Sequence, residues 1–296
     1  MEILKSLRHA VRTHPTLGRM ALYAIPDIRW SVNVRGIGLM SIHLRRNRSY
    51  WLRDPLHHES FMLGAMQRLI RPNDIVFDVG ANLGLYVRFM VQRFGAGRVI
   101  AFEPMSQNQA LLYQNIRLGN CQDRVQIVAT ALADYEGMDE FQTDDISSAS
   151  GTLNVVTHGE PSQARRQYGL PPITETVTVS CLDTMVESGI VPVPNVIKVD
   201  VEGAEERLLR GAVRTLEKHS PSLAIEMHGP EESRKVVRLL LEIGYSLFGF
   251  LNNDKGRIYR EIEKSHIDEI KDPYSLHHCI AGRDPELLRT PINLRL

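Results

Sequence analysis

The sequence of 296 residues has an ordinary globular composition, with 43% hydrophobic and 24% charged residues, and can bury a sizeable core. Basic and acidic residues each number 35, so no net charge draws the chain toward nucleic acid, and we expect no nucleic-acid partner. The three cysteines lack metal-ligand spacing, which favours a reducing, cytoplasmic location over a disulfide framework. Charges interrupt residues 1–22, so we expect neither a signal peptide nor a transmembrane segment.

Residues 1–56 are predicted to form an N-terminal extension that caps the main domain. Apolar spacing indicates a short helix over about residues 1–25, and alternation around two glycines indicates a hairpin within residues 30–52. The main domain is expected over residues 57–296 and opens with a helix at about 57–70.

Short apolar runs then alternate with amphipathic stretches. Buried strands are predicted over residues 75–79, 98–102, 125–131, 196–199 and 222–227. The helices between and after them are predicted over residues 83–94, 106–119, 204–218 and 231–243. This alternation predicts a doubly wound α/β fold with a parallel sheet and right-handed crossovers. Two last strands, 245–250 and 276–281, lack a long connecting helix and could pair antiparallel.

Residues 134–180 interrupt this rhythm. They contain many serines and threonines and three prolines, with little helical periodicity, and residues 176–180 alternate like an edge strand. We interpret the stretch as an insertion, and long insertions of this kind are often lids or binding loops.

A glycine-rich turn follows the first buried strand. It begins at Asp78 and contains Gly80, Asn82 and Gly84, directly before a predicted helix. Glycines let a ligand approach the backbone closely, and the helix start attracts an anionic group. Asn82 stands where the dinucleotide fingerprint G-x-G-x-x-G has its second glycine, which argues against a nicotinamide cofactor. S-adenosylmethionine fits better, with its ammonium near Asp78; purely structural glycines are the alternative.

An acidic residue ends the second strand. Glu103, followed by Pro104, lies about 25 residues after Asp78. A carboxylate at this position can accept both hydroxyl protons of a ribose, and the spacing suits such a site. The alternative is a solvated glutamate at a strand end. Together with the glycine turn, the pattern favours ribose binding.

Polar side chains gather at the ends of two further strands. Lys198, Asp200 and Glu202 come from one strand, and Glu226 and His228 from the next. Ligands of open α/β sheets bind outside the carboxyl ends of the strands, so these residues should face the reaction space. Helix capping by the acids and a satisfied histidine are the alternative for any single residue.

Two kinds of chemistry suit this set. Asp200 or His228 could act as a general base that removes a proton from an acceptor hydroxyl. In a metal-assisted version, Asp200, Glu202, Glu226 and His228 would hold a divalent ion. Their spacing does not favour that version, so no metal is predicted.

The glycine turn, Phe102-Glu103-Pro104 and residues 197–205 together closely resemble the FkbM family of S-adenosylmethionine-dependent methyltransferases. The segment that contains Ala131 and Leu132 also looks like that family's pattern, so both are assigned to cofactor binding. The likeness covers about residues 59–250. It implies a class I methyltransferase fold with a Rossmann-like, seven-stranded sheet, S-adenosylmethionine as cofactor, and methyl transfer to a hydroxyl.

The family's acceptors are mostly sugars and polyketide- or lipid-linked natural products. The polar, aromatic-poor insertion and the carboxylates at the strand ends favour a sugar, glycolipid or glycosylated natural product. A polyketide, lipid or protein acceptor is the first alternative. A nicotinamide-dependent oxidoreductase and a non-catalytic nucleoside-binding module are further alternatives. No sequence pattern indicates an oligomeric state.

Overall fold

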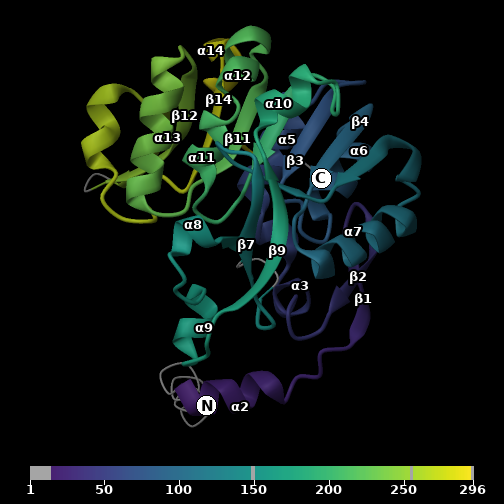
Figure 1. Ribbon diagram of the computed structural model, residues 1–296. Coiled ribbons are helices and arrows are strands. Elements are labelled where there is room, and N and C mark those ends of the chain that lie inside the picture. Colours follow the sequence, from purple (N-terminus) through teal and green to yellow (C-terminus); the bar gives the residue numbers. More distant parts are fainter. Residues whose placement is uncertain (1–14, 148–150, 254–255, 295–296) are drawn as a thin grey trace.

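The computed structural model describes residues 15–147, 151–253 and 256–294, and a central eight-stranded sheet dominates them (Figure 1). Its strands follow the spatial order β5 (Val125–Val128), β4 (Arg98–Phe102), β3 (Ile75–Val79), β10 (Val196–Val199), β11 (Ser222–Glu226), β14 (His278–Gly282), β12 (Ser246–Asn253) and β13 (Gly256–Glu261). From β5 to β11 the strands pair parallel. β14 pairs antiparallel with both β11 and β12, as the lack of a long helix between the last two predicted strands allowed.

Helices cover the two faces of the parallel part of the sheet, and successive side chains of a strand point to opposite faces. In β3, Val76 packs into one core cluster, whereas Phe77 and Val79 pack into the other. The first cluster is covered by α5 (Ser60–Leu69), α6 (Leu85–Gln92), α7 (Ser106–Leu118) and α14 (Pro285–Leu288). The second is covered by α10 (Leu182–Glu187), α11 (Glu205–Arg210), α12 (Val213–His219) and α13 (Pro230–Glu242). The predicted doubly wound α/β fold is therefore confirmed.

The sheet has one strand more than the seven that the family resemblance implied. No strand was predicted directly after β12, but residues 256–261 form β13, which pairs antiparallel with β12. The segment between β13 and β14 contains a 3-10 helix, Lys264–Glu269.

The predicted third strand, 125–131, divides between two sheets. β5 ends at Val128, and the following β6 (Thr130–Leu132) leaves the central sheet to pair parallel with β9 (Ile173–Ser180). The expected insertion supplies the rest of this second sheet, whose order is β6, β9, β7 (Gly137–Thr143) and β8 (Thr152–Leu153). Two short helices, α8 (Asn154–Thr157) and α9 (Gln163–Gln167), accompany it. In Figure 1, β7 and β9 extend from the central sheet toward α9.

Two predicted helices are each divided. The first consists of α4 (Pro55–His58) and α5, which are separated at Glu59. The second consists of α11 and α12, separated at Gly211. A Cβ at Gly211 would lie 1.9 Å from the carbonyl oxygen of Ala133, so only glycine permits this approach to the chain after β6.

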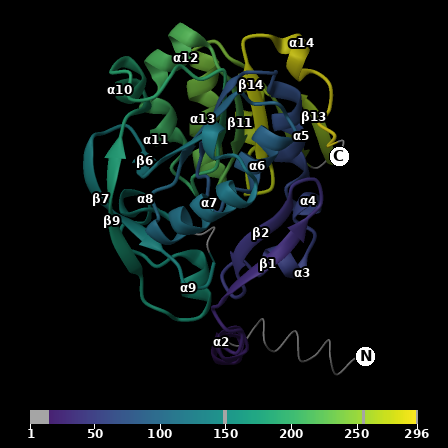
Figure 2. The same cartoon turned by 90° about the vertical axis from the view of Figure 1, so that its right-hand side faces the viewer.

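The N-terminal extension packs against the main domain. It contains α2 (Pro15–Tyr23), the predicted hairpin of β1 (Arg29–Val34) and β2 (Gly38–His43), and α3 (Ser49–Leu52). The start of the predicted N-terminal helix, residues 1–14, lies outside the described residues. The Asn115 amide on α7 accepts from the backbone N–H of Ser41 on β2 and donates to the carbonyls of Ser41 and Leu83. The buried Arg88 of α6 donates to two hairpin carbonyls, and Figure 2 shows β2 beside α7.

Candidate active site

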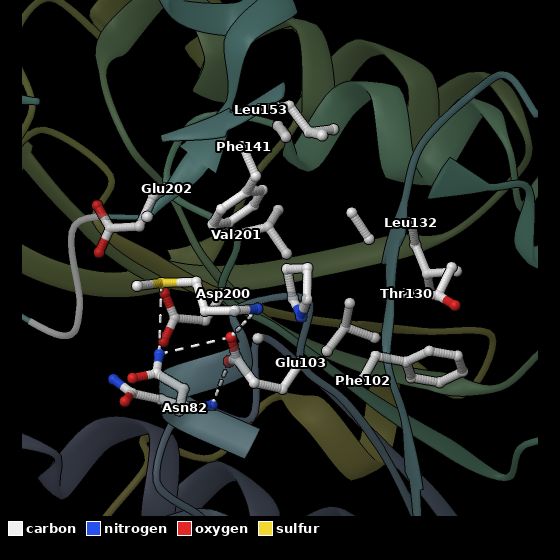
Figure 3. Close-up of a pocket in the computed structure, with 18 residues that line it drawn as sticks. Asn82, Phe102, Glu103, Thr130, Leu132, Phe141, Leu153, Asp200, Val201 and Glu202 are labelled. Atoms are coloured by element: carbon white, nitrogen blue, oxygen red, sulfur yellow. Dashed lines mark hydrogen bonds between the residues drawn. The ribbon is translucent and has the colours of Figure 1, made fainter. Parts of the chain in front are cut away.

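A pocket opens at the carboxyl ends of β3, β4 and β10, where the second sheet meets the central one (Figure 3). The empty space between its walls is about 620 Å³, open mouth included. Eight residues predicted from sequence line it: Gly80, Asn82, Glu103, Pro104, Ala131, Leu132, Asp200 and Glu202. The fold thus brings the glycine turn, the ribose candidate and two acids of the reaction set to one place.

Five other residues predicted from sequence are not among the described residues that line the pocket: Asp78, Gly84, Lys198, Glu226 and His228. Gly84 precedes the first turn of α6, where a Cβ would lie 2.6 Å from a methyl carbon of Leu112 on α7. Its place is therefore explained by close helix packing.

Gly80 is required by the close approach of two strand ends. Its φ is +78°, and a Cβ there would lie 1.8 Å from the carbonyl oxygen of Asp200. We expected this glycine to make room for a ligand. The structure shows a second reason, which is that the turn after β3 touches the chain leaving β10.

Glu103 is a buried carboxylate held by backbone donors. Its Oε2 accepts from the N–H of Asn82 at 2.7 Å, and its Oε1 accepts from the N–H of Met105 at 2.9 Å. Burial raises the pKa of Glu103 to about 7, although these two hydrogen bonds and Asn108 act to lower the pKa. A carboxylate oxygen has room for more than one donor, so the side chain can still accept from ligand hydroxyls.

Several lining residues were not predicted. Phe141 of β7 and Leu153 of β8 form an apolar wall, with Gly151 beside them. A Cβ at Gly151 would lie 2.6 Å from the Phe141 ring and from the sulfur of Met105. The only sequence signal for this wall was the interpretation of residues 134–180 as a binding loop, which named no residues.

Asp78, Lys198 and Asp200 form a line of charges. Lys198 Nζ lies 3.1 Å from Asp78 Oδ1 and 3.3 Å from Asp200 Oδ2, and it donates to the carbonyl of Gly80 at 3.0 Å. Asp78 has no exposed surface and is not among the described residues that line the pocket. Burial raises the pKa of Asp78 against the opposing effect of Lys198. Burial also acts to raise the pKa of Asp200, but Lys198 and His228 outweigh it and the pKa is lowered.

His228 sits among four carboxylates. Its Nδ1 lies 2.7 Å from Glu205 Oε1, and its Nε2 lies 3.6 Å from Glu202, 3.8 Å from Glu226 and 3.9 Å from Asp200. Burial alone would lower the pKa of His228, but the hydrogen bond with Glu205 and the charges nearby raise it to about 10. Burial also raises the pKa of two of these acids, that of Glu202 to about 8 and that of Glu226 to about 7.

Comparison with known sequences decides the family. A family model described as the Methyltransferase FkbM domain matches residues 78–251, which is more than half of the chain. The chain belongs to the FkbM methyltransferase family. It is therefore a methyltransferase, and the alternatives of an oxidoreductase and of a non-catalytic module are set aside.

Two relatives with known names agree with this assignment. The hexuronic acid methyltransferase AglP of Haloferax volcanii is 28% identical over 192 residues, which cover 65% of this chain and 72% of AglP. The 31-O-demethyl-FK506 methyltransferase FkbM of Streptomyces tacrolimicus is 29% identical over 160 residues, covering 48% of this chain and 60% of that protein. A crystal structure of an FkbM methyltransferase from Methylobacillus flagellatus aligns with a TM-score of 0.42 and 17% identity, covering 74% of this chain and half of that one.

S-adenosylmethionine is the methyl donor of this family and fold, and the pocket suits it. Its lining combines the buried carboxylate of Glu103 with the apolar side chains of Phe141 and Leu153. Asn82 Oδ1 is buried and lacks a hydrogen-bond partner among the described residues, so it is available to a ligand donor.

No helix in the described part of the chain is long and apolar enough to cross a membrane.

Proposed function

We propose that this chain transfers a methyl group to a hydroxyl of a sugar, glycolipid or glycosylated natural product. The observation that carries the proposal is that Asp200 lines the same pocket as Glu103. A nucleoside held at Glu103 would therefore have a carboxylate beside its reactive end. The name of AglP, a hexuronic acid methyltransferase, supports a sugar as acceptor.

The cofactor assignments are part of this proposal. Glu103 would bind the ribose, the backbone around Gly80 and Asn82 would hold the amino-acid end, and the segment with Ala131 and Leu132 would border the base. When bound, S-adenosylmethionine supplies a methyl group on a positively charged sulfur, which an acceptor oxygen displaces in line. Holding that oxygen in position contributes on the order of 7–11 kcal/mol to such reactions.

We assign the general base to Asp200 rather than His228. Asp200 lines the pocket, whereas His228 does not, and proton transfer requires hydrogen-bond reach to the acceptor hydroxyl. Lys198 is a positioning residue in this account, because its Nζ joins Asp200 to Asp78 and to the turn at Gly80. Glu202, which also lines the pocket, would accept a second hydroxyl of a polyol.

Glu202 has an unusual backbone that supports a functional role. Its φ is +52°, in the left-handed region that side chains other than those of Gly, Asn and Asp rarely adopt. Such conformations tend to occur at functional sites. The carboxylate is turned to within 3.6 Å of His228.

Three free cysteines support a cytoplasmic location as part of the same proposal.

The proposed small-molecule or glycan acceptor has two alternatives. A polyketide acceptor finds support in the name of the Streptomyces relative. A protein or lipid acceptor has no observation in its favour.

The test uses S-adenosylmethionine with a labelled methyl group. The enzyme is incubated with a hexuronic acid glycoside, a neutral glycoside, a macrolide polyketide and cell extract, and mass spectrometry locates the label. We expect label on a sugar oxygen, lost in Asp200→Asn and retained in Asp268→Asn, an exposed matched control. Label found only on the polyketide, on protein or on nucleobases would refute the sugar acceptor.

A further inference from the structure

A group of histidines surrounds Glu226 at the carboxyl end of β11. Nε2 of His277 lies 3.4 Å from Glu226 Oε1, and Nε2 of His278 lies 3.5 Å from Glu226 Oε2. Such spacings match the edge of about 3.4 Å that joins two ligand atoms of a tetrahedral ion with bonds of about 2.1 Å. Glu226, His277 and His278 each place one ligand atom within 4.8 Å of the others.

A second set of three shares the same glutamate. Asp200, Glu226 and His228 also bring one ligand atom each within 4.8 Å of one another. Glu226 therefore belongs to both sets. His278 begins β14 and His277 directly precedes it, whereas Asp200 follows β10 and His228 follows β11.

The orientation of two imidazoles is independent support for a cation site. Nδ1 of His277 faces the carbonyl oxygen of Met227 at 3.2 Å, and Nδ1 of His228 faces the buried Glu205 at 2.7 Å. An acceptor at Nδ1 favours the proton on that nitrogen, so in the neutral imidazole Nε2 carries the lone pair that a cation beside Glu226 would take. Metal-binding histidines are typically fixed in this way by a backbone carbonyl or a carboxylate.

The balance of charge also favours a bound cation. Glu226, Glu202, Glu205 and Asp200 gather around His228. Lys198, which contacts Asp200, is also shared with Asp78 and the carbonyl of Gly80. A proton on His228 could offset part of this negative charge, and a divalent cation would offset more.

We propose that Glu226, His277 and His278 bind a divalent transition-metal cation, with Asp200 and His228 as an adjoining set across Glu226. Two imidazoles favour zinc, cobalt, iron or nickel over magnesium and calcium, which prefer oxygen ligands. Three protein ligands leave coordination positions free for other oxygens. The sequence spacing did not reveal this set, because His277 and His278 reach Glu226 only through the antiparallel pairing of β11 with β14.

The role of this cation rests on the proposed function. Because Asp200 lines the cofactor pocket and belongs to the adjoining set, the cation would lie beside the acceptor. A divalent ion there can hold an acceptor oxygen and lower the pKa of its hydroxyl.

Direct metal titration tests the site without reference to activity. Chelator-treated protein is titrated with Co²⁺, followed by its visible absorption, and with Zn²⁺, followed by calorimetry. We expect one equivalent to bind. Glu226→Gln and His277→Ala should weaken Zn²⁺ binding beyond the roughly 10–100-fold that loss of an orienting partner costs. Glu217 and His219 are exposed, so Glu217→Gln and His219→Ala are matched controls that should bind Zn²⁺ as the native chain does.

S-adenosylmethionine binding and the thermal midpoint of each variant establish that it is folded, and His278→Asn serves where His277→Ala does not fold. Folded native protein that binds S-adenosylmethionine but neither Co²⁺ nor Zn²⁺ would overturn the proposal, as would metal binding that is unchanged in the folded ligand variants. Metal binding without sugar methylation would leave the site standing and refute the proposed function. Methylation at the full rate after chelation would refute the role of the cation alone.

Discussion

Removing the Lys198 charge is expected to destabilise the fold strongly. Lys198 is 1% exposed and Asp78 is fully buried, with 3.1 Å between Nζ and Oδ1. In Lys198→Met, Asp78 keeps a buried carboxylate without its partner, which costs about 3–5 kcal/mol. The unfolding entropy is about 2.1 cal/mol/K per residue, so for 296 residues the thermal midpoint should fall by about 5–8 °C.

A double-mutant cycle measured by thermal and urea unfolding checks this reasoning. Asp78→Asn alone should cost less, because Lys198 keeps Asp200 at 3.3 Å and the carbonyl of Gly80 at 3.0 Å. The double variant with Asp78→Asn and Lys198→Met removes both charges and should recover part of the loss of Lys198→Met. A coupling energy of about 1–3 kcal/mol is expected. Costs that add to within about 0.5 kcal/mol would show that the two charges do not depend on one another.

Three further predictions concern the pocket. Asp200→Asn should lower kcat by about 10²- to 10⁴-fold with nearly native cofactor affinity, and equal loss of both in calorimetry and kinetics would assign Asp200 to binding instead. The pKa of Glu103 is about 7, and only its ionised form can accept from both ribose hydroxyls. Cofactor affinity should therefore be full above pH 7 and fall as the pH drops below that value. Calorimetry between pH 5.5 and 8.5 on the native chain checks this, and Glu103→Gln should remove the dependence. Gly80→Ala should abolish cofactor binding and lower the thermal midpoint more than Gly189→Ala, whose φ is +74° but whose Cβ would meet nothing within 4 Å. Equal effects in the two variants would contradict the contact with Asp200.

The parallel strands and the glycine turn could be read from sequence because local patterns specify them. Residues 75–79 and 98–102 form the very strands that their apolar runs predicted. Gly80, Asn82 and Glu103 lie together because parallel strands place their carboxyl ends at one edge of the sheet.

The residues that were missed depend on contacts between distant segments. Val128 and Thr130 look like one strand, yet β6 leaves the central sheet because its partner is β9, more than 40 residues later. Phe141 reaches the pocket through that second sheet, and His277 and His278 reach Glu226 through β14. The burial of Asp78 could not be predicted from the sequence either, since nothing near Asp78 in the sequence shows that Lys198 covers its carboxylate.

Calorimetric titration with S-adenosylmethionine tests the central claim, that the pocket at Glu103 is the cofactor site. The native chain should bind one equivalent. Glu103→Ala should weaken binding by about 1.5–3 kcal/mol for each charge-assisted hydrogen bond lost, less what water restores. Glu140→Ala, an exposed glutamate on β7, should bind as tightly as the native chain. Unchanged affinity in folded Glu103→Ala, or no binding by the native chain, would contradict the account.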